Sequence, residues 1–570
     1  MSDVNYSIPA EAAKLLHDGI IGNPLHSDAP AELANAAQSI SFEGTALPSI
    51  PINWRFAESI SAIKGFQGAM LNVLLKRKHG LEEYPRITIN TDHAQLFIMS
   101  IALTQILDPS VSAPVDRNKI GSSGAERYFP NRDIHNSLHD WHRRAATNIY
   151  RTRDNRFYHI HGSMNPEPTQ GALGISACVD PEPASPADAV KPYAVKVAEL
   201  AAAEIDELMN GKNRQAGTIC YSAEEYLASE HGRANAHVGL YELHHHANPE
   251  QPPAWWPAPA GADPKRPLFG LKVVELARVI AAPSVTRELA ELGASVMRIT
   301  APHITDMSAL FPDLNWGKWE AELDLREEAD KEKLRALIMD ADVVLDGYRP
   351  GVMQKWGFGK DDILNMRENS EKGIIYAREN CYGWQGPWAG RSGWQQISDA
   401  CCGVSLGFGR AMGNDEPVTP VFPNSDYCTG ASGATGVLQA LIERGSKGGS
   451  YVVDIALNYY SQWLINSCGE YPTDVFQDVW DRNGHVVFRH DQNMLQSLPV
   501  YIGMILKSPL MTPGFFEERE SKAIGVKLRT PKPVLCFPSG EVELRFNVGT
   551  RGNGVDRPVW PENLLTEVVA

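Results

Sequence analysis

Apolar and polar positions in the second half of the chain follow two alternating periods, which predict strands separated by helices. Short apolar runs with branched side chains, typical of buried strands, lie at 271–277, 295–300, 341–346 and 373–378. Residues 284–293 and 327–340 have the spacing of helices, and the first of these ends at Gly293. Because strands that alternate with helices pair in parallel, we predict an α/β fold with a mostly parallel sheet covered on both faces.

The first half of the chain has a different pattern, which indicates a mixture of helices and short strands. The predicted elements, in chain order, are a helix at 57–78, a strand at 86–90, a buried helix at 93–107, a hairpin at 149–162, and helices at 195–209 and 221–232. The hairpin turn is expected at Asp154 and Asn155. Residues 149–243 therefore combine a predicted hairpin with two predicted helices, and a family resemblance described below implies that they form a small α+β domain.

A proline-rich stretch at 247–266 forms the clearest boundary and is expected to be a semi-rigid linker between 1–246 and 267–570. The two sides also resemble each other in one place. Residues 65–97 and 433–465 share the order small-residue helix, basic turn, strand and helix. In this alignment Glu58 or Ser59 falls where Asp426 stands.

Residues 424–444 carry the strongest candidate chemistry and allow two interpretations. The glycines at 430, 433 and 436 suggest a nicotinamide-dinucleotide fingerprint, whereas Asp426 is a carboxylate at a helix start that could act as a nucleophile. A fingerprint needs a buried strand that leads into the first glycine, but Pro420 and Pro423 interrupt this approach. We therefore expect the glycines to lie inside a helix, where they give a narrow face for close packing.

Composition excludes several classes of function. A chain of 570 residues with 43% hydrophobic residues is expected to form two or more domains. The formal net charge of −16 disfavours a nucleic-acid or anionic-membrane partner. No apolar run has membrane-spanning length, and the first residues lack the pattern of a signal peptide, so we expect a cytoplasmic protein.

The cysteines and histidines do not predict a metal site. None of the eight cysteines forms a CxxC pair, so free thiols in a reducing compartment are expected. The run at 244–246 is interpreted as a surface histidine tract beside the linker. His159 and His161 alternate on one predicted strand, where a cross-strand structural role is favoured over a place above a substrate cleft.

Several motifs in the second half, taken in order, resemble the class III CoA-transferases of the CaiB/BaiF family. This family includes formyl-CoA transferases and α-methylacyl-CoA racemases. The motifs are LFGLKVVELARVIAAPSVTRELAELGASVMRI, LDL, ADVVLDGYRPGVMQKWGFG, CYGWQGPWAGRSG and SDYCTGASGATGVLQALIER. The resemblance implies a Rossmann-like domain plus a small α+β domain in two interlocked rings.

The resemblance also suggests how the two halves are related. Residues 1–246 look like a degenerate copy that lacks its front, and 267–466 look like a front domain with the active site. Residues 467–570 would form a C-terminal return segment. This degenerate tandem resembles two-part members of the family found in fungi. The family topology favours a homodimer, although the tandem would permit a monomer.

The family resemblance assigns roles to particular residues. Asp426 matches the catalytic aspartate, which forms a mixed anhydride with an acyl group and then an enzyme–CoA thioester before a carboxylic acid collects the CoA. Positions that hold CoA in the family match Arg278, Val279, Ala281, Tyr348 and Arg349. No tightly bound cofactor is implied, because coenzyme A and acyl-CoA are substrates.

Other functions remain as alternatives. Racemases of the family use a histidine in a GHD motif, and the matching residues here are Gly393, Trp394 and Gln395, so one of the two usual bases is missing. Trp394 is expected to narrow the acyl site instead. A racemase, a non-catalytic CoA-binding protein and, as the weakest alternative, a nicotinamide oxidoreductase stay open.

Overall fold

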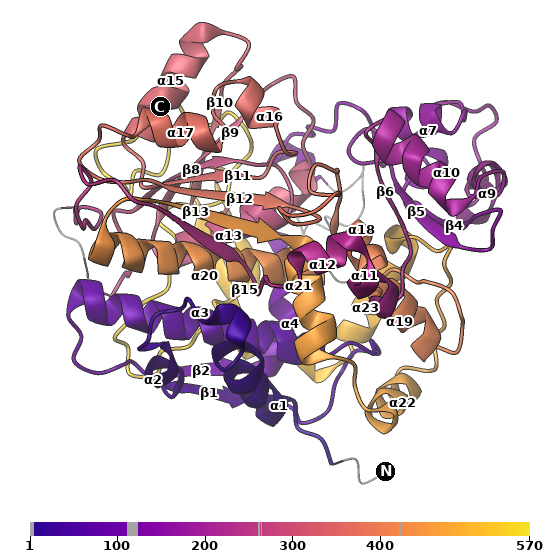
Figure 1. Ribbon diagram of the computed structural model, residues 1–570, viewed down its shortest axis with the longest axis horizontal. Helices are drawn as coiled ribbons and strands as arrows, with labels where there is room; N and C mark the ends of the chain where they lie inside the picture. Colours follow the sequence, from indigo (N-terminus) through magenta and orange to yellow (C-terminus); the bar gives the residue numbers. More distant parts are fainter. Residues whose placement is uncertain (1–4, 111–123, 260–262, 264, 421–422) are drawn as a thin grey trace.

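The computed structural model describes residues 5–110, 124–259, 263, 265–420 and 423–570. Its centre is a seven-stranded sheet of order β10-β9-β8-β11-β12-β13-β7, in which β7 alone is antiparallel to its neighbour (Figure 1). The strands are β7 (Glu242–His246), β8 (Lys272–Leu276), β9 (Ser295–Thr300), β10 (Lys318–Glu322), β11 (Val343–Asp346), β12 (Ile375–Asn380) and β13 (Ser450–Ala456). This confirms the predicted Rossmann-like parallel sheet.

Helices cover both faces of this sheet. Successive side chains of a strand point to opposite faces, so each strand contributes to a core on either side. Val273 belongs to the core that includes residues of α13 (Ala281–Glu291) and α20 (Asn424–Lys447). Val274 belongs to a second core with residues of α15 (Glu328–Met339). The continuous apolar runs read from the sequence are therefore explained by burial on two faces.

The first half adds a layer outside α20 (Figure 1). Helix α3 (Phe56–His79) packs along α20, and the first half continues through β2 (Ile87–Asn90) and α4 (Thr91–Phe97). In the second half α20 is followed by β13 and α21 (Leu457–Trp463), so the order predicted from the internal resemblance is present. Helices α3 and α20 thus pack against each other on one side of the main sheet (Figure 1).

The two first-half residues that align with Asp426, Glu58 and Ser59, are buried and hydrogen-bonded inside the protein. Glu58 is fully buried, and its carboxylate accepts hydrogen bonds from the hydroxyls of Tyr6 and Tyr471 at 2.7 and 2.8 Å. Ser59 is also fully buried, and its Oγ lies 2.9 Å from Tyr460 Oη. Both side chains therefore have internal partners.

The small domain stands beside the main sheet, at the upper right of Figure 1. Strands β4 (Asn148–Arg151), β5 (Phe157–His161) and β6 (Ala216–Ile219) form an antiparallel sheet. The hairpin predicted at 149–162 is confirmed, and Asn155 in its turn has a φ of 60°. Its helices are α6 (Trp141–Arg144), α7 (Glu167–Ala172), α8 (Pro186–Ala189), α9 (Lys191–Ala198) and α10 (Ala202–Asp206). The next two helices, α11 (Ala223–Ala228) and α12 (Glu230–Asn235), lie outside it (Figure 1), and Tyr226 of α11 packs in a core with Tyr382 and Leu457.

Three helices predicted as continuous are interrupted. The segment 93–107 contains α4, the short α5 (Ser100–Leu103) and then β3 (Gln105–Leu107), because β3 pairs with β15 (Val526–Pro531) from the C-terminal segment. The segment 195–209 breaks before α10, whose first N–H group is bound by the carboxylate of Asp154. The segment 221–232 breaks at Ser229, whose Oγ accepts from the N–H of Gly232 in α12. Local capping and a distant strand partner thus override helical periodicity.

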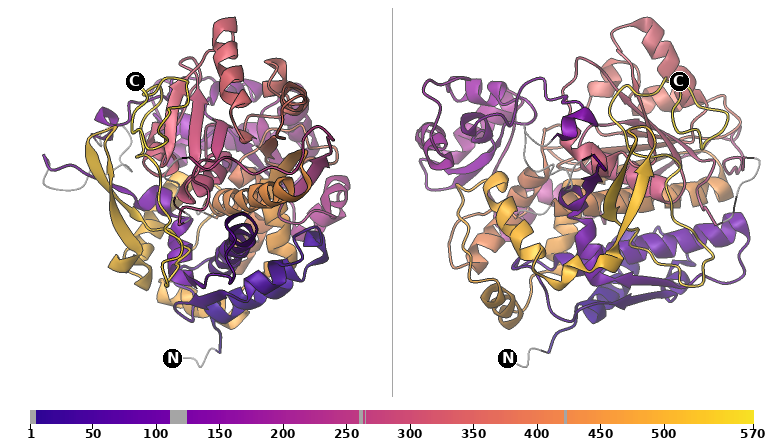
Figure 2. Two further views of the ribbon diagram at one scale, coloured as in Figure 1. Left: turned by 90° about the vertical axis from the view of Figure 1, so that its left-hand side faces the viewer. Right: turned by 180° about the vertical axis from the view of Figure 1, so that it is seen from behind.

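The C-terminal segment crosses back over the molecule. It contains α22 (Thr473–Arg482), α23 (Met494–Ile505) and β14 (Phe516–Ser521), which pairs with β15 (Figure 2, right). No helix among the described residues is long and apolar enough to cross a membrane. The boundaries of the tandem remain a prediction, although β7 shows that the end of the first half completes the edge of the main sheet.

The glycines of α20 are required for close helix packing. A Cβ added to Gly430 would lie 2.4 Å from Ser284 Cβ of α13, and one on Gly433 would lie 2.6 Å from Ile455 of β13. These glycines lie within the helix rather than in a strand-to-helix turn. The nicotinamide-dinucleotide interpretation is therefore wrong.

Substitution of Gly430 by alanine is expected to destabilise the protein by about 1–3 kcal/mol, because α13 must move to admit the methyl group. Chemical denaturation of Gly430→Ala beside wild type measures this loss. Gly503 of α23 is a matched helical control, since a Cβ there meets nothing within 4 Å. An unchanged midpoint for Gly430→Ala would contradict the close packing of α13 and α20.

Candidate active site

Asp426 lies in the first turn of α20 and faces a cavity of about 170 Å³. The helix begins at Asn424, directly after Pro423, whose missing N–H group costs nothing at a helix start. Val279 and Ile280 line the same cavity from the loop between β8 and α13. Asp426 is only 7% exposed, and among the described residues that line this cavity it is the one carboxylate.

Burial raises the pKa of Asp426 to about 8. Glu379 of β12 is paired with Ile455, whose side chain faces α20, so Glu379 lies on the same face of the sheet as Asp426. Burial, with the charges of Asp426 and Asp346, raises the pKa of Glu379 to about 8. Burial and the charge of Asp426 also raise the pKa of Asp399 well above its usual range. Ionisation of Asp426 therefore disfavours ionisation of Glu379 and of Asp399.

The first half of the chain supplies another wall of the cavity. His161 of β5 stacks on Trp394 with ring centroids 4.9 Å apart, and both residues line the cavity. Trp394 Nε1 donates to Ser163 Oγ at 3.1 Å, and the N–H of Ser163 donates to His161 Nδ1 at 2.9 Å. Because burial lowers the pKa of His161 well below its usual range, this imidazole is neutral. The cavity is thus formed jointly by both halves.

Arg278 and Arg349, both expected at the CoA site, lie near each other. Arg278 donates to the carbonyl of Thr305 at 3.3 Å, and its guanidinium lies 5.7 Å from the ring of Tyr348. Arg349 donates to Ser163 Oγ at 3.2 Å. Partial burial and the charges of Arg278 and Arg214 lower the pKa of Arg349. Within the described part of the chain, no carboxylate forms an ion pair with Arg278 or Arg349.

The other predicted positions lie close to these arginines. Tyr348 borders a second cavity of about 60 Å³, which Thr300, His303 and Trp356 also line. Ala281 begins α13 and is buried in a cluster that includes Tyr382, so it does not face either cavity directly. Arg278 lies in the chain between Leu276, which lines the second cavity, and Val279, which lines the first. Tyr348 lines the second cavity.

The sequence did not reveal the whole site. His161 was expected to be structural, but it lines the larger cavity. Ser163, Glu379 and Asp399 were not singled out, although a glutamate at the end of the apolar run 373–378 was an available signal. Trp394 does line the cavity, at the position where a racemase would carry its histidine.

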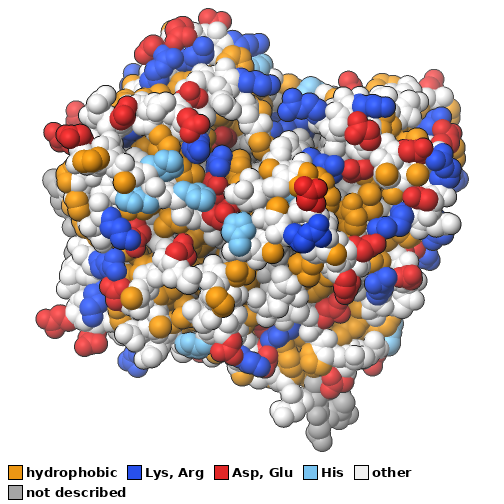
Figure 3. All heavy atoms as spheres, in the orientation of Figure 1, with side chains coloured by type: hydrophobic (Ala, Val, Ile, Leu, Met, Phe, Trp, Pro, Cys, Tyr) orange, Lys and Arg blue, Asp and Glu red, His pale blue; other side chains and the backbone are white. Residues whose placement is uncertain are grey.

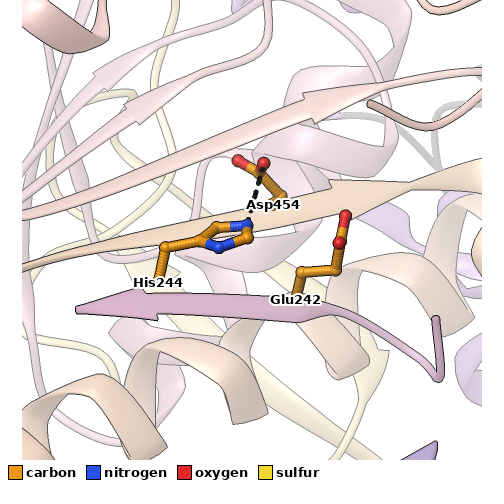
Figure 4. Close-up of side chains that lie close together, drawn as sticks. All are labelled: Glu242, His244 and Asp454. Carbon is orange, nitrogen blue, oxygen red and sulfur yellow. Dashed lines mark ion pairs between the residues drawn. The ribbon is translucent and has the colours of Figure 1, made fainter. Parts of the chain in front are cut away.

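A separate group, made of Glu242, His244 and Asp454, has side chains suited to metal binding (Figure 4). These residues lie on β7 and β13, and His244 Nε2 is 3.4 Å from Asp454 Oδ2. Arg378 already binds both oxygens of Asp454, at 2.6 and 2.8 Å, and Tyr459 donates to Glu242 at 2.6 Å. The group is therefore an ion-pair network. Figure 3 shows several histidines together on one face, among interspersed acidic and basic side chains.

Comparison with known proteins identifies close relatives. A sequence model of CoA-transferase family III matches residues 268–471. The acetyl-coenzyme A transferase nodX of Hypoxylon pulicicidum is 50% identical, and the alignment covers 100% of this chain and 96% of that protein. An acyl-CoA transferase of Gibberella moniliformis is 29% identical over 95% of this chain and 93% of that protein.

Other relatives match part of the chain. The acetyl-CoA:oxalate CoA-transferase of Acetobacter aceti is 30% identical over 34% of this chain and 52% of that protein. The crystal structure of a CaiB/BaiF family protein from Brucella suis covers 35% of this chain and 55% of that one, with 28% identity and a TM-score of 0.31.

The full-length similarity at 50% identity shows the family, and it confirms the resemblance inferred from the ordered motifs. The relatives are transferases of CoA, which supports that reaction over racemisation and over a purely binding role. The chain belongs to CoA-transferase family III and is an enzyme that transfers CoA.

Proposed function

We propose that the enzyme moves CoA from an acyl-CoA to a carboxylic acid, with Asp426 as the nucleophile. The Asp426 carboxylate attacks the thioester carbonyl, which forms a mixed anhydride and releases CoA thiolate. The thiolate then attacks the aspartyl carbonyl, which releases the first acid and leaves an aspartyl–CoA thioester. The second acid repeats these two steps in reverse order and leaves as its CoA thioester. The observation that carries this proposal is a buried carboxylate at a helix start, which is the one carboxylate among the described residues that line the cavity.

Coenzyme A would enter as a substrate beside the turn after β8. Arg278 and Arg349 have no carboxylate partner among the described residues, so their charges are available to phosphate groups. The N-terminus of α13 at Ala281 adds a favourable dipole for an anion. Tyr348 and its cavity would hold part of the nucleotide, and Val279 would contact the chain that leads to the thioester.

The donor and the molecular organisation are also proposals. Acetyl-CoA is the first donor to test, because the relative with 50% identity is an acetyl-coenzyme A transferase. The tandem of 1–246, 247–266, 267–466 and 467–570 is supported by the matching order of elements around α3 and α20. A homodimer is the proposed oligomeric state, and size-exclusion chromatography with light scattering tests it.

Incubation with acetyl-CoA and other acyl-CoAs is expected to add the mass of CoA, less water, to the enzyme. Intact-protein mass spectrometry measures this adduct, and hydroxylamine should remove it, because a thioester on Asp426 is reactive to this nucleophile. Peptide mapping should place the adduct on Asp426. Absence of an adduct, under conditions where transfer between two acids is measured, would rule out the covalent route.

Transfer should be faster at moderately alkaline pH. The nucleophile must be ionised, and burial raises the pKa of Asp426 to about 8, so the carboxylate form becomes scarcer below that pH. We expect kcat/KM to fall about tenfold for each pH unit below the pKa and to level off above it. Initial rates across about pH 6 to pH 9 measure this profile, with circular dichroism as the control for unfolding. A flat profile would show that Asp426 is already ionised in the free enzyme.

A further inference from the structure

The cavity that Asp426 lines is also lined by an arginine that forms no ion pair with any described carboxylate. Arg144 is the last residue of α6 in the first half, and it lines the cavity together with Asn493 of the C-terminal segment. Its Nε donates to the carbonyl of Leu138 at 2.8 Å, and its guanidinium lies 4.6 Å from the ring of Trp141. Within the described residues, neither an ion pair nor a hydrogen bond occupies its two terminal amino groups.

The neighbouring arginine, Arg143, differs from Arg144 because its guanidinium has carboxylate partners. Arg143 also lines the cavity, but its Nη2 is 3.0 Å from Glu167 Oε1 and its Nε is 3.7 Å from Asp140 Oδ2. Arg144 is partly buried, and burial lowers the pKa of its guanidinium although the charge of Asp140 opposes this change. Among the described residues no carboxylate lies within ion-pair distance of it. Burial of a cation is unfavourable unless it is paired, so a ligand that supplies an anion would be favoured at Arg144.

Arg144 does not serve Asp426. Among the described residues the guanidinium of Arg144 donates to the carbonyl of Leu138 and forms no ion pair with Asp426. They belong to different walls of the cavity, one from the small domain and one from α20. Much of the remaining wall is apolar and includes Leu138, Met164, Leu310, Met494, Leu495 and Trp394.

We propose that the acid which exchanges CoA at this site is a short dicarboxylic acid with an apolar middle, and that Arg144 binds its second carboxylate. This inference rests on the proposed reaction at Asp426. One carboxyl group would react at Asp426 while the guanidinium of Arg144 holds the other through charge-assisted hydrogen bonds. The cavity of about 170 Å³ is small for a ligand site, which favours a chain of only a few carbons.

Paired acceptors of equal chain length test the proposal. With one CoA donor, pentanoate is compared with glutarate, and hexanoate with adipate. Wild type is expected to prefer the dicarboxylate in kcat/KM by on the order of 10- to 100-fold, the value of one buried charge-assisted contact. Arg144→Gln should abolish this preference by raising KM for the dicarboxylate, with little change for the monocarboxylate. Arg144→Lys should restore part of it.

Two controls separate recognition from general damage. Arg153→Gln removes an exposed arginine of the same domain that is paired with Glu204, and it should leave the preference unchanged. The KM for the CoA donor should also be unchanged in Arg144→Gln, whereas a role in binding CoA phosphates would raise it and overturn the proposal. Equal losses for both acceptors, or no preference in wild type, would overturn it as well.

Failure of the reaction and failure of the inference remain distinguishable. If wild type transfers CoA to no acid, the proposed function fails, and calorimetry with the free enzyme decides the role of Arg144. Glutarate that binds wild type more tightly than pentanoate, and loses this advantage in Arg144→Gln, would support the anion site. Equal binding of both acids would reject it.

Discussion

Replacement of Asp426 by asparagine is expected to lower kcat by on the order of 10,000-fold or more, because an amide of the same shape cannot form the anhydride or the thioester. The CoA adduct should disappear together with the activity. Transfer assays and intact-protein mass spectrometry on the same preparations measure both quantities. The KM for the acyl-CoA should change little, since the substituted side chain keeps the volume of the cavity.

The loss should not come from unfolding. The pKa of Asp426 in the folded state, about 8, lies above that of an unfolded aspartate, so ionisation costs stability as pH rises toward 8. Asparagine carries no such charge, and Asp426→Asn should unfold at the same or a higher temperature than wild type at pH 8. Cys428→Ala, a buried change in the same helical turn, should retain adduct formation. An Asp426→Asn enzyme with more than about a tenth of wild-type kcat would disprove the nucleophilic role.

The sequence predicted the main sheet well, since each strand carries its own signal. Val273 and Val274 are both apolar because both faces of the sheet are covered, and such runs are recognisable without tertiary information. Asp426 was found in the same way, from a local motif followed by glycines. Features encoded within one short segment were therefore accessible.

Features that depend on contacts between residues far apart in the sequence could not be predicted from it. The helix predicted at 93–107 ends early because β3 pairs with β15, more than 400 residues later in the chain. His161 and Arg144 reach the cavity only because the small domain folds against the loop at Trp394. Their roles depend on a contact between the two halves, and no local pattern around either residue announces it.

The contact between α3 and α13 gives the other large expected effect, on stability. Lys64 of the first half and Glu288 of the second half are both almost completely buried, and Lys64 Nζ lies 2.5 Å from Glu288 Oε2. Gln67 joins the pair, because its Nε2 donates to Glu288 at 2.9 Å and its Oε1 accepts from Lys64 at 3.1 Å. The charges are therefore satisfied only when the two halves are together.

Lys64→Ala is expected to destabilise the protein by about 3–5 kcal/mol, because it removes the nearest cation from the buried Glu288 carboxylate. The other cation, Arg287, is 3.8 Å from Glu288 and is shared with Asp313. Urea denaturation followed by tryptophan fluorescence measures the loss. The double variant Lys64→Met/Glu288→Leu should recover most of it, since no charge is then left unpaired. Lys191→Ala, which removes an exposed pair with Asp188, should change stability by less than about 1 kcal/mol. If Lys64→Ala behaved like Lys191→Ala, apolar packing of α3 on α20 would be sufficient to hold the halves together. The expected loss would instead mean that the first half contributes the cation nearest to a buried carboxylate of the second half, so that the two halves depend on each other for stability.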